Sequence, residues 1–162
     1  MNRRIPAFVT LLVIFIAVSV HAQSVRKLPA DFAKFLDAAD AAQRQLQNGK
    51  ADGYKALWST ADDVTLSGGF GGKIEKGWSA VSARLDWAAS QFNNGTNTIE
   101  RVSAAASGDL GYLVQIEHIK FKTSAGADST RDFRVTMVFR KERGKWRIIH
   151  RHADGQTAKV PA

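Results

Sequence analysis

Two histidines lie two residues apart in the segment KWRIIHRHADG, which begins at Lys145. Side chains two apart on a β-strand point to the same face, so we expect His150 and His152 to share a face with Trp146 and Ile148. An imidazole titrates near neutral pH and can therefore move a proton or respond to the charge of a ligand. The spacing makes His150 the candidate catalytic residue and His152 a second residue of the same pocket.

A purely structural role is the alternative for both histidines, with each imidazole bonded to a backbone carbonyl or to Asp154. His118 is a third candidate, on an expected strand whose same side carries Val114. If that side faces inward, His118 could join His150, and three histidines can bind zinc. The two strands would lie about 9–10 Å apart, which is wide for a shared ion, and we expect no metal and no cofactor.

The elements that must position these residues follow from the spacing of apolar side chains. Apolar residues recur at helical spacing from Ala30 to Leu46, and Asn48-Gly49 supplies a stop. The second half of the chain is interrupted by glycine-containing turns and is typical of strands. Helices followed by a strand meander indicate an α+β fold. The expected helices cover 30–46, 52–58 and 77–92, and the expected strands cover 64–66, 98–105, 111–122, 131–140 and 145–153.

A two-residue turn at Arg143-Gly144 would set the pairing of the last two strands. In that register Phe139 pairs with Ile148, and Met137 pairs with His150. One face is then apolar with two histidines set into it, and the three helices must cover it. The other face is expected to be basic and solvated, and it carries Arg134, Arg140, Arg147 and Arg151.

Aromatic residues and glycines indicate where a pocket could lie. Trp87 is roughly 140° from the centre of the apolar stripe of its helix. We expect it either at the mouth of a pocket or in a subunit interface, where tryptophan is enriched. Four glycines within residues 68–72 indicate a turn or bulge in which the backbone passes close to another group. For Trp58, Phe70, Trp78 and Trp146 a core position is favoured, and a place in the ligand pocket is the alternative.

The first residues have the pattern of a signal peptide. Arg3 and Arg4 precede an apolar run, and Val20-His21-Ala22 fits a cleavage site. We expect processing after residue 22 and export to the periplasm or outside the cell, with one domain over 28–155 and a tail over 156–162. An uncleaved membrane anchor is the alternative, but the run is shorter than the about 20 apolar residues that span a bilayer.

Composition narrows the class of function. The chain has no cysteine, so neither a disulfide framework nor thiol catalysis is available. The net charge of +8 favours anionic partners, but the basic residues are scattered, and we expect no binding to nucleic acid.

At this point the chain resembles a known family. The tail from Trp146 to Asp154, with Phe133-Arg134-Val135-Thr136 before it, is similar to the SnoaL-like domains of the nuclear-transport-factor-2-like superfamily. The association domain of calcium/calmodulin-dependent protein kinase has a related ending. The resemblance covers about residues 28–155 and implies a cone, in which three N-terminal helices pack on a strongly curved antiparallel sheet around an internal pocket.

Ketosteroid isomerases and polyketide cyclases share this fold, and the resemblance can be tested residue by residue. The position of the isomerases' general base falls on Gly68, and that of their helix tyrosine falls near Ala42. Their protonated aspartate falls near Thr136 or Met137. None of these side chains can do the corresponding chemistry, so the catalytic residues are not carried over.

The sequence therefore predicts an exported, small-molecule-binding domain of SnoaL-like type that forms a homodimer. A hydrophobic or anionic molecule is the expected ligand. The alternatives are an acid–base enzyme (an isomerase, dehydratase or cyclase) that uses His150, and an assembly module. The expected pocket residues are Trp58, Phe70, Val114, His118, Met137, His150 and His152.

Overall fold

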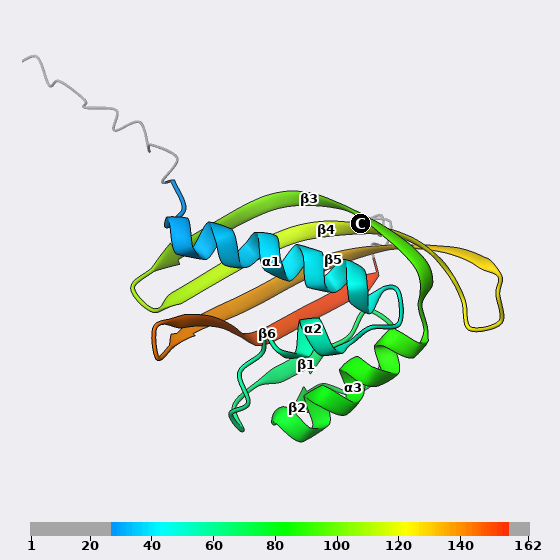
Figure 1. Cartoon of the computed structure of the whole chain (residues 1–162), viewed down its shortest axis with the longest axis horizontal. Coiled ribbons are helices and arrows are strands. Elements are labelled where there is room, and N and C mark those ends of the chain that lie inside the picture. Colours follow the sequence, from blue (N-terminus) through cyan, green and yellow to red (C-terminus); the bar gives the residue numbers. More distant parts are fainter. Residues whose placement is uncertain (1–26, 156–162) are drawn as a thin grey trace, which may run out of the picture.

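The computed structural model describes residues 27–155, and the expected signal peptide and tail lie outside these residues. Three helices precede a long meander, as expected (Figure 1). No helix in the described range is long and apolar enough to cross a membrane. The helices are α1 (Ala30–Leu46), α2 (Asp52–Lys55) and α3 (Trp78–Ser90), and the strands are β1 (Thr65–Ser67), β2 (Glu75–Lys76), β3 (Asn93–Ser107), β4 (Leu110–Lys122), β5 (Asp128–Glu142) and β6 (Lys145–Gly155).

The six strands form one sheet in the order β2-β1-β6-β5-β4-β3. The sheet is mixed rather than wholly antiparallel, because β1 runs parallel to β6. The parallel pairing begins before β1 itself, where the Ile148 N–H donates to the Leu57 carbonyl and the Ser59 N–H donates to the Ile148 carbonyl, each at 2.9 Å. The chain after α2 therefore lies along the start of β6.

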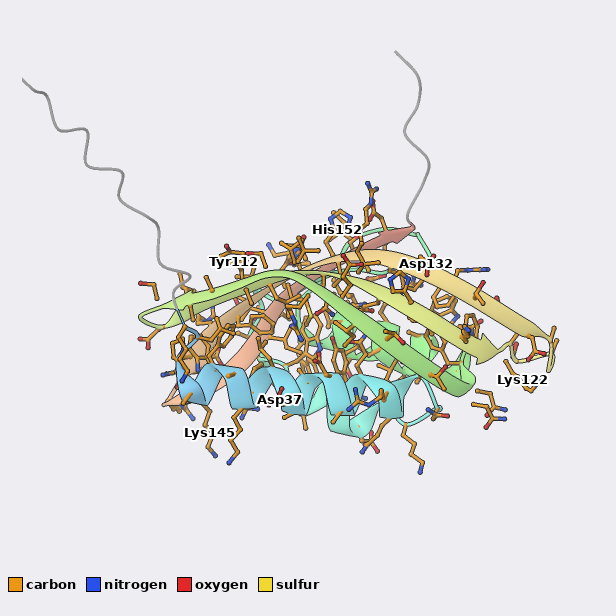
Figure 2. All side chains as sticks on the ribbon, turned by 90° about the horizontal axis from the view of Figure 1, so that it is seen from above. Asp37, Tyr112, Lys122, Asp132, Lys145 and His152 are labelled. Carbon is orange, nitrogen blue, oxygen red and sulfur yellow. The ribbon has the colours of Figure 1, made fainter. Side chains whose placement is uncertain are left out.

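The helices cover one face of the curved sheet, and the core lies between them. α1 crosses the long strands on that face, whereas Tyr112 and His152 lie on the opposite, convex face (Figure 2). The apolar stripe expected for α1 is buried, and Phe32 contacts Phe139 and Trp146 with ring centroids 5.3 and 4.7 Å apart. The α+β class and the packing of the helices on the sheet are thus as predicted.

The pairing of the long strands has three register irregularities, one of them at the start of β3 between Asn93 and Thr96 and two in the middle of the sheet. β3 has a register shift between Arg101 and Ser103, and the β5–β6 pair has one between Phe139 and Val138. An extra residue in one strand bends the sheet and reverses the alternation of side chains beyond it. The bulge in the β5–β6 pair has the larger consequence for the site.

Candidate functional site

The bulge in β6 brings an arginine into the cone. Phe139 pairs with Ile148, as expected from the turn, but the next pair is Val138 with His150, which leaves Ile149 as the extra residue. The expected pairing of Met137 with His150 is therefore wrong, because Met137 pairs with Arg151. From this point the alternation is reversed, so that Arg151 lies among the core residues instead of on the solvated face.

Arg151 meets a buried carboxylate inside the cone. Glu117 on β4 is 0% exposed, and the Arg151 side chain is 11% exposed. The guanidinium donates two hydrogen bonds to the carboxylate, Nη1 to Oε1 at 2.9 Å and Nη2 to Oε2 at 2.8 Å. This paired geometry is the most favourable one for an arginine and a carboxylate.

Two glutamines complete the environment of Glu117. Gln43 on α1 donates to Oε2, and Gln115 on β4 donates to Oε1 at 2.7 Å. Burial by itself raises the pKa of Glu117, but the charge of Arg151 and these hydrogen bonds outweigh it, so that the pKa lies below its ordinary value. The residue is ionised at neutral pH, and each of its oxygens already accepts two hydrogen bonds.

A cavity of about 60 Å³ lies beside this ion pair. Its walls are largely apolar and aromatic, and its charged lining residues are Glu117, Arg151 and Arg84. The volume is sufficient for one or two water molecules, since water occupies about 30 Å³ in the liquid. The lining residues include Gln47, Tyr54, Phe70, Trp87, Phe92 and Phe133.

Phe70 and Trp87 close the mouth of the cavity. Phe70 is the centre of an aromatic cluster and contacts Trp87, Phe92, Phe121 and Phe133. Trp87 is 42% exposed and lies at the pocket mouth, which was one of its two expected positions. Arg84 lies over the Trp87 ring in a cation–π contact. Its Cζ atom is 4.1 Å from the ring centre.

The glycine-rich segment crosses the cavity where side chains would not fit. A Cβ atom on Gly69 would lie 2.7 Å from Cε1 of Phe133, which is too close for any side chain. Arg84 holds the same segment by donating a hydrogen bond from Nη2 to the Gly71 carbonyl at 2.7 Å. The expectation that backbone passes close to another group here is confirmed, and the neighbour is an aromatic wall of the cavity.

One polar group in the cavity has no hydrogen-bond partner among the described residues. Gln47, which directly follows α1, is 1% exposed, and its Oε1 is an unpaired acceptor. A buried acceptor without a partner costs about 1–3 kcal/mol, so a hydrogen-bond donor brought in by water or a ligand would be stabilised here. Gln47 is the polar lining residue with an unused acceptor.

The histidines of β6 lie away from this cavity. His150 is half-buried on the convex face, where its Nδ1 lies 2.8 Å from Oγ1 of Thr65, and burial together with nearby His152 lowers its pKa. His152 is exposed and pairs across the strands with Thr136. The reason is the bulge at Ile149, which reverses the alternation that the sequence prediction continued through the strand.

The other expected pocket residues divide between three places. His118 and Val114 lie on the convex side of β4, and Nδ1 of His118 is 2.8 Å from Asp132 Oδ1. Met137 is buried behind the ion pair, and its sulfur lies 3.7 Å from Nη1 of Arg151. Phe70 lines the cavity, whereas Trp58 lines a separate groove.

Sequence reasoning missed Glu117, although a signal for it was present. The residues two and four positions away on the same side of β4 are Leu113, Gln115, Ile119 and Phe121, and they are all buried. A charged residue among buried positions of a largely apolar alternation indicates a buried ion pair. The prediction instead followed the His118 side of the strand.

The chain belongs to the SnoaL-like domain family, which it matches over residues 36–153. The sheet and helices have the fold of solved NTF2-like proteins, as the resemblance implied. A comparison with curated proteins finds no match.

Solved structures share the fold at low sequence identity. A proposed dehydratase of the NTF2-like family from Streptomyces avermitilis has a TM-score of 0.68 and 18% identity, over 80% of this chain and 100% of that one. A proposed calcium/calmodulin-dependent protein kinase type II association domain from Thiobacillus denitrificans gives 0.66 and 19%, over 82% and 100%. A ketosteroid isomerase-like protein from Erwinia carotovora atroseptica gives 0.63 and 16%, over 80% and 96%.

Proposed function

We propose that the domain binds a small molecule in the cone cavity. The observation that carries this proposal is the polar end of the cavity, where a buried ion pair and an unpaired glutamine oxygen face aromatic walls. A buried ion pair adds little stability compared with apolar residues of the same volume. Its presence beside a cavity is therefore better explained by recognition than by stability.

The arrangement favours a compact ligand with an apolar body and one hydrogen-bond donor. Glu117 and Arg151 neutralise each other, and the remaining charged lining residue, Arg84, lies over the Trp87 ring and donates to the Gly71 carbonyl. Gln47 offers an acceptor for a hydroxyl or amide N–H, and Phe70, Phe92 and Phe133 offer contacts for a ring. A ring exceeds the present volume, so Phe70 and the glycine-rich segment must move outward when it binds.

An acid–base enzyme is the alternative that this cavity favours less. Glu117 is held ionised with its oxygens already bonded, and burial raises the pKa of Tyr54 to about 12. Among the described residues that line the cavity, none titrates near neutral pH as a general base requires. His150, the earlier candidate, lies on the other face of the sheet.

The test compares phenol with anisole, its methyl ether, which lacks the donor. The indole N–H signal of Trp87, followed by NMR, reports the mouth of the cavity. We expect phenol to shift this signal saturably and to bind more tightly than anisole, because only phenol can donate to Gln47.

The matched variants are Gln47→Leu and His150→Ala. We expect Gln47→Leu to abolish the preference for phenol and His150→Ala to leave it unchanged. Equal binding of the two probes to the wild type, or loss of the preference only in His150→Ala, would overturn the proposed site.

We also propose that the domain acts after export. The support is the pattern of residues 1–22, a basic start, an apolar run and a Val-His-Ala site. N-terminal sequencing of protein from the periplasm or medium should begin at Gln23. A chain that retains Met1 in the membrane fraction would contradict this.

A further inference from the structure

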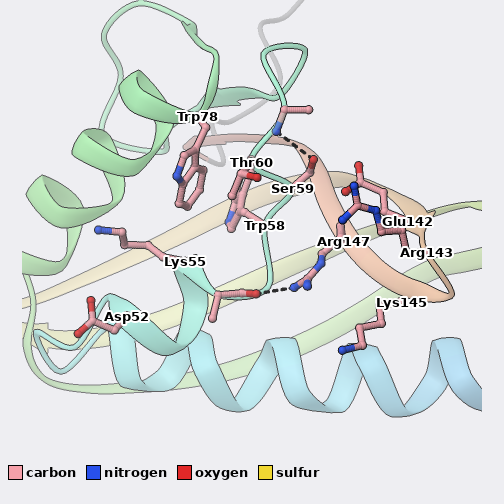
Figure 3. Close-up of a pocket in the computed structure, with 12 residues that line it drawn as sticks. Asp52, Lys55, Trp58, Ser59, Thr60, Trp78, Glu142, Arg143, Lys145 and Arg147 are labelled. Atoms are coloured by element: carbon pink, nitrogen blue, oxygen red, sulfur yellow. Dashed lines mark hydrogen bonds between the residues drawn. The ribbon is translucent and has the colours of Figure 1, made fainter.

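A groove on the outside of the domain is separate from the cone cavity. It has a volume of about 970 Å³ and lies between α2, the 56–61 segment, the start of α3 and the β5–β6 hairpin. Figure 3 shows two tryptophans reaching it from the helical side and several cations reaching it from the hairpin. Of the expected pocket residues, only Trp58 lines it.

The charges that line this groove are mainly positive once internal ion pairs are counted. Lys55 is bonded to Asp86, whereas Glu142 shares the Arg140 guanidinium with Asp63, so this trio keeps one negative charge. Arg143, Lys145 and Arg147 remain without a carboxylate partner within the described part of the chain. Of the lining acids, Asp52 alone has no such ion pair.

The hairpin presents these cations in a defined arrangement. Arg143 has a φ of 50° in the two-residue turn, where asparagine, aspartate or glycine is favoured over a long side chain. Nη1 of Arg147 donates to the Ala56 carbonyl at 2.6 Å, which holds the guanidinium at the wall of the groove (Figure 3). Guanidinium groups match the oxygens of carboxylates and phosphates.

The aromatic part of the groove contains a buried donor without a partner. Trp58 is 2% exposed, and its indole N–H makes no hydrogen bond with the residues that the structure describes. Trp78 lines the groove with its ring half-buried. An acceptor that enters along the groove would satisfy the indole N–H, and a flat ring would pack against the tryptophans.

We propose that this groove is a second ligand site, which takes an aromatic molecule with an anionic carboxylate or phosphate group. The anion lies near Arg143, Lys145 and Arg147, and the ring lies against Trp78 and Trp58. The net charge of the chain, +8 in full and +6 without Arg3 and Arg4 of the expected signal peptide, raises the local concentration of such anions. The site differs from the cone cavity in charge and position, so it does not depend on the function proposed above.

The test uses phenyl phosphate, benzoate and inorganic phosphate, followed through the indole N–H signals. Single Trp→Phe variants assign these signals. We expect phenyl phosphate to shift the signals of Trp58 and Trp78 saturably while that of Trp87 stays in place. It should bind at least about tenfold more tightly than inorganic phosphate because of the ring, a difference of about 1.4 kcal/mol. Benzoate shows whether a carboxylate can replace the phosphate.

Two variants distinguish binding in the groove from non-specific attraction of anions to the positive charge of the protein. We expect R143Q combined with K145Q to weaken phenyl phosphate about tenfold. The matched control, R131Q, removes an exposed cation from the other end of β5 and should leave binding unchanged. A shift confined to Trp87, the absence of saturation, or equal losses in both variants would overturn the proposal.

Discussion

At the scale of single residues, substitutions in the ion pair of Glu117 and Arg151 have the largest expected effect on stability. Arg151→Met leaves the carboxylate buried without its charge partner, and breaking such a pair costs about 3–5 kcal/mol. Glu117→Gln should have a similar cost, because it leaves the Arg151 guanidinium buried without its carboxylate partner. The double variant should lose much less than the sum, because neither charge remains unpaired. Urea unfolding of the wild type and three variants measures this difference.

The control for this cycle is the exposed pair of Arg134 and Asp154. Arg134→Met should cost much less than Arg151→Met, because solvent screens an exposed ion pair. If the Glu117 and Arg151 variants prove additive, the two side chains do not form the buried unit that the structure shows.

The buried Glu117 carboxylate also determines how the stability of the domain responds to acid. The pKa of Glu117 in the fold lies below its ordinary value of 4.5, so the native state favours the ionised form. The resulting stabilisation is complete above that ordinary value and is lost as the pH falls through the lowered pKa. The free energy of unfolding should therefore fall less steeply below pH about 4.5 in Glu117→Gln than in the wild type. Parallel curves would show that Glu117 does not contribute to acid unfolding.

At the level of elements, the sequence predicts where helices and strands lie in the chain better than it predicts which side chains of a strand face the core. α1 has the expected bounds, Ala30–Leu46, and the Arg143-Gly144 turn sets the first pairs of the last hairpin. Local spacing cannot locate the bulge at Ile149, because a bulge depends on the curvature that the whole sheet adopts. Because of this one extra residue, the Arg151 side chain lies inside the cone and the His150 side chain lies on the convex face. For this reason the sequence analysis predicted the fold but did not predict the site.

The bulge gives a prediction about deletions. Removal of Ile149 regularises β6 while keeping the pairs Phe139 with Ile148 and Met137 with Arg151. We expect this variant to unfold cooperatively and to lose no more than about 2 kcal/mol, since most of the loss comes from one partly buried side chain. Urea unfolding and the phenol titration measure the outcome.

The matched control is deletion of Thr136, an exposed residue in the regular part of β5. Its removal shifts the register against both neighbouring strands and turns core residues outward, so we expect the cooperative transition to disappear. If both deletions are equally damaging, the extra residue at Ile149 is needed for the curvature of the cone.

At the scale of the whole molecule, no helix within residues 27–155 packs on the convex face of the sheet. The helices occupy the other face, whereas Tyr112 points away from them (Figure 2). Val102 is 60% exposed and Tyr112 is 43% exposed, and Val114, Ile116 and Val138 on the same face are partly exposed. Apolar side chains gathered on one face favour an interface between copies of a protein.

We predict that the processed chain forms a homodimer through this convex face at micromolar concentration. Light scattering should report twice the mass of one chain, and Val102→Asp combined with Tyr112→Asp should halve it, because charges are costly in the core of an interface. Ile74→Asp is the control, since Ile74 is 66% exposed but lies in the segment before β2. A wild type that remains monomeric, or a dimer that only the Ile74 variant dissociates, would rule out this face as the interface.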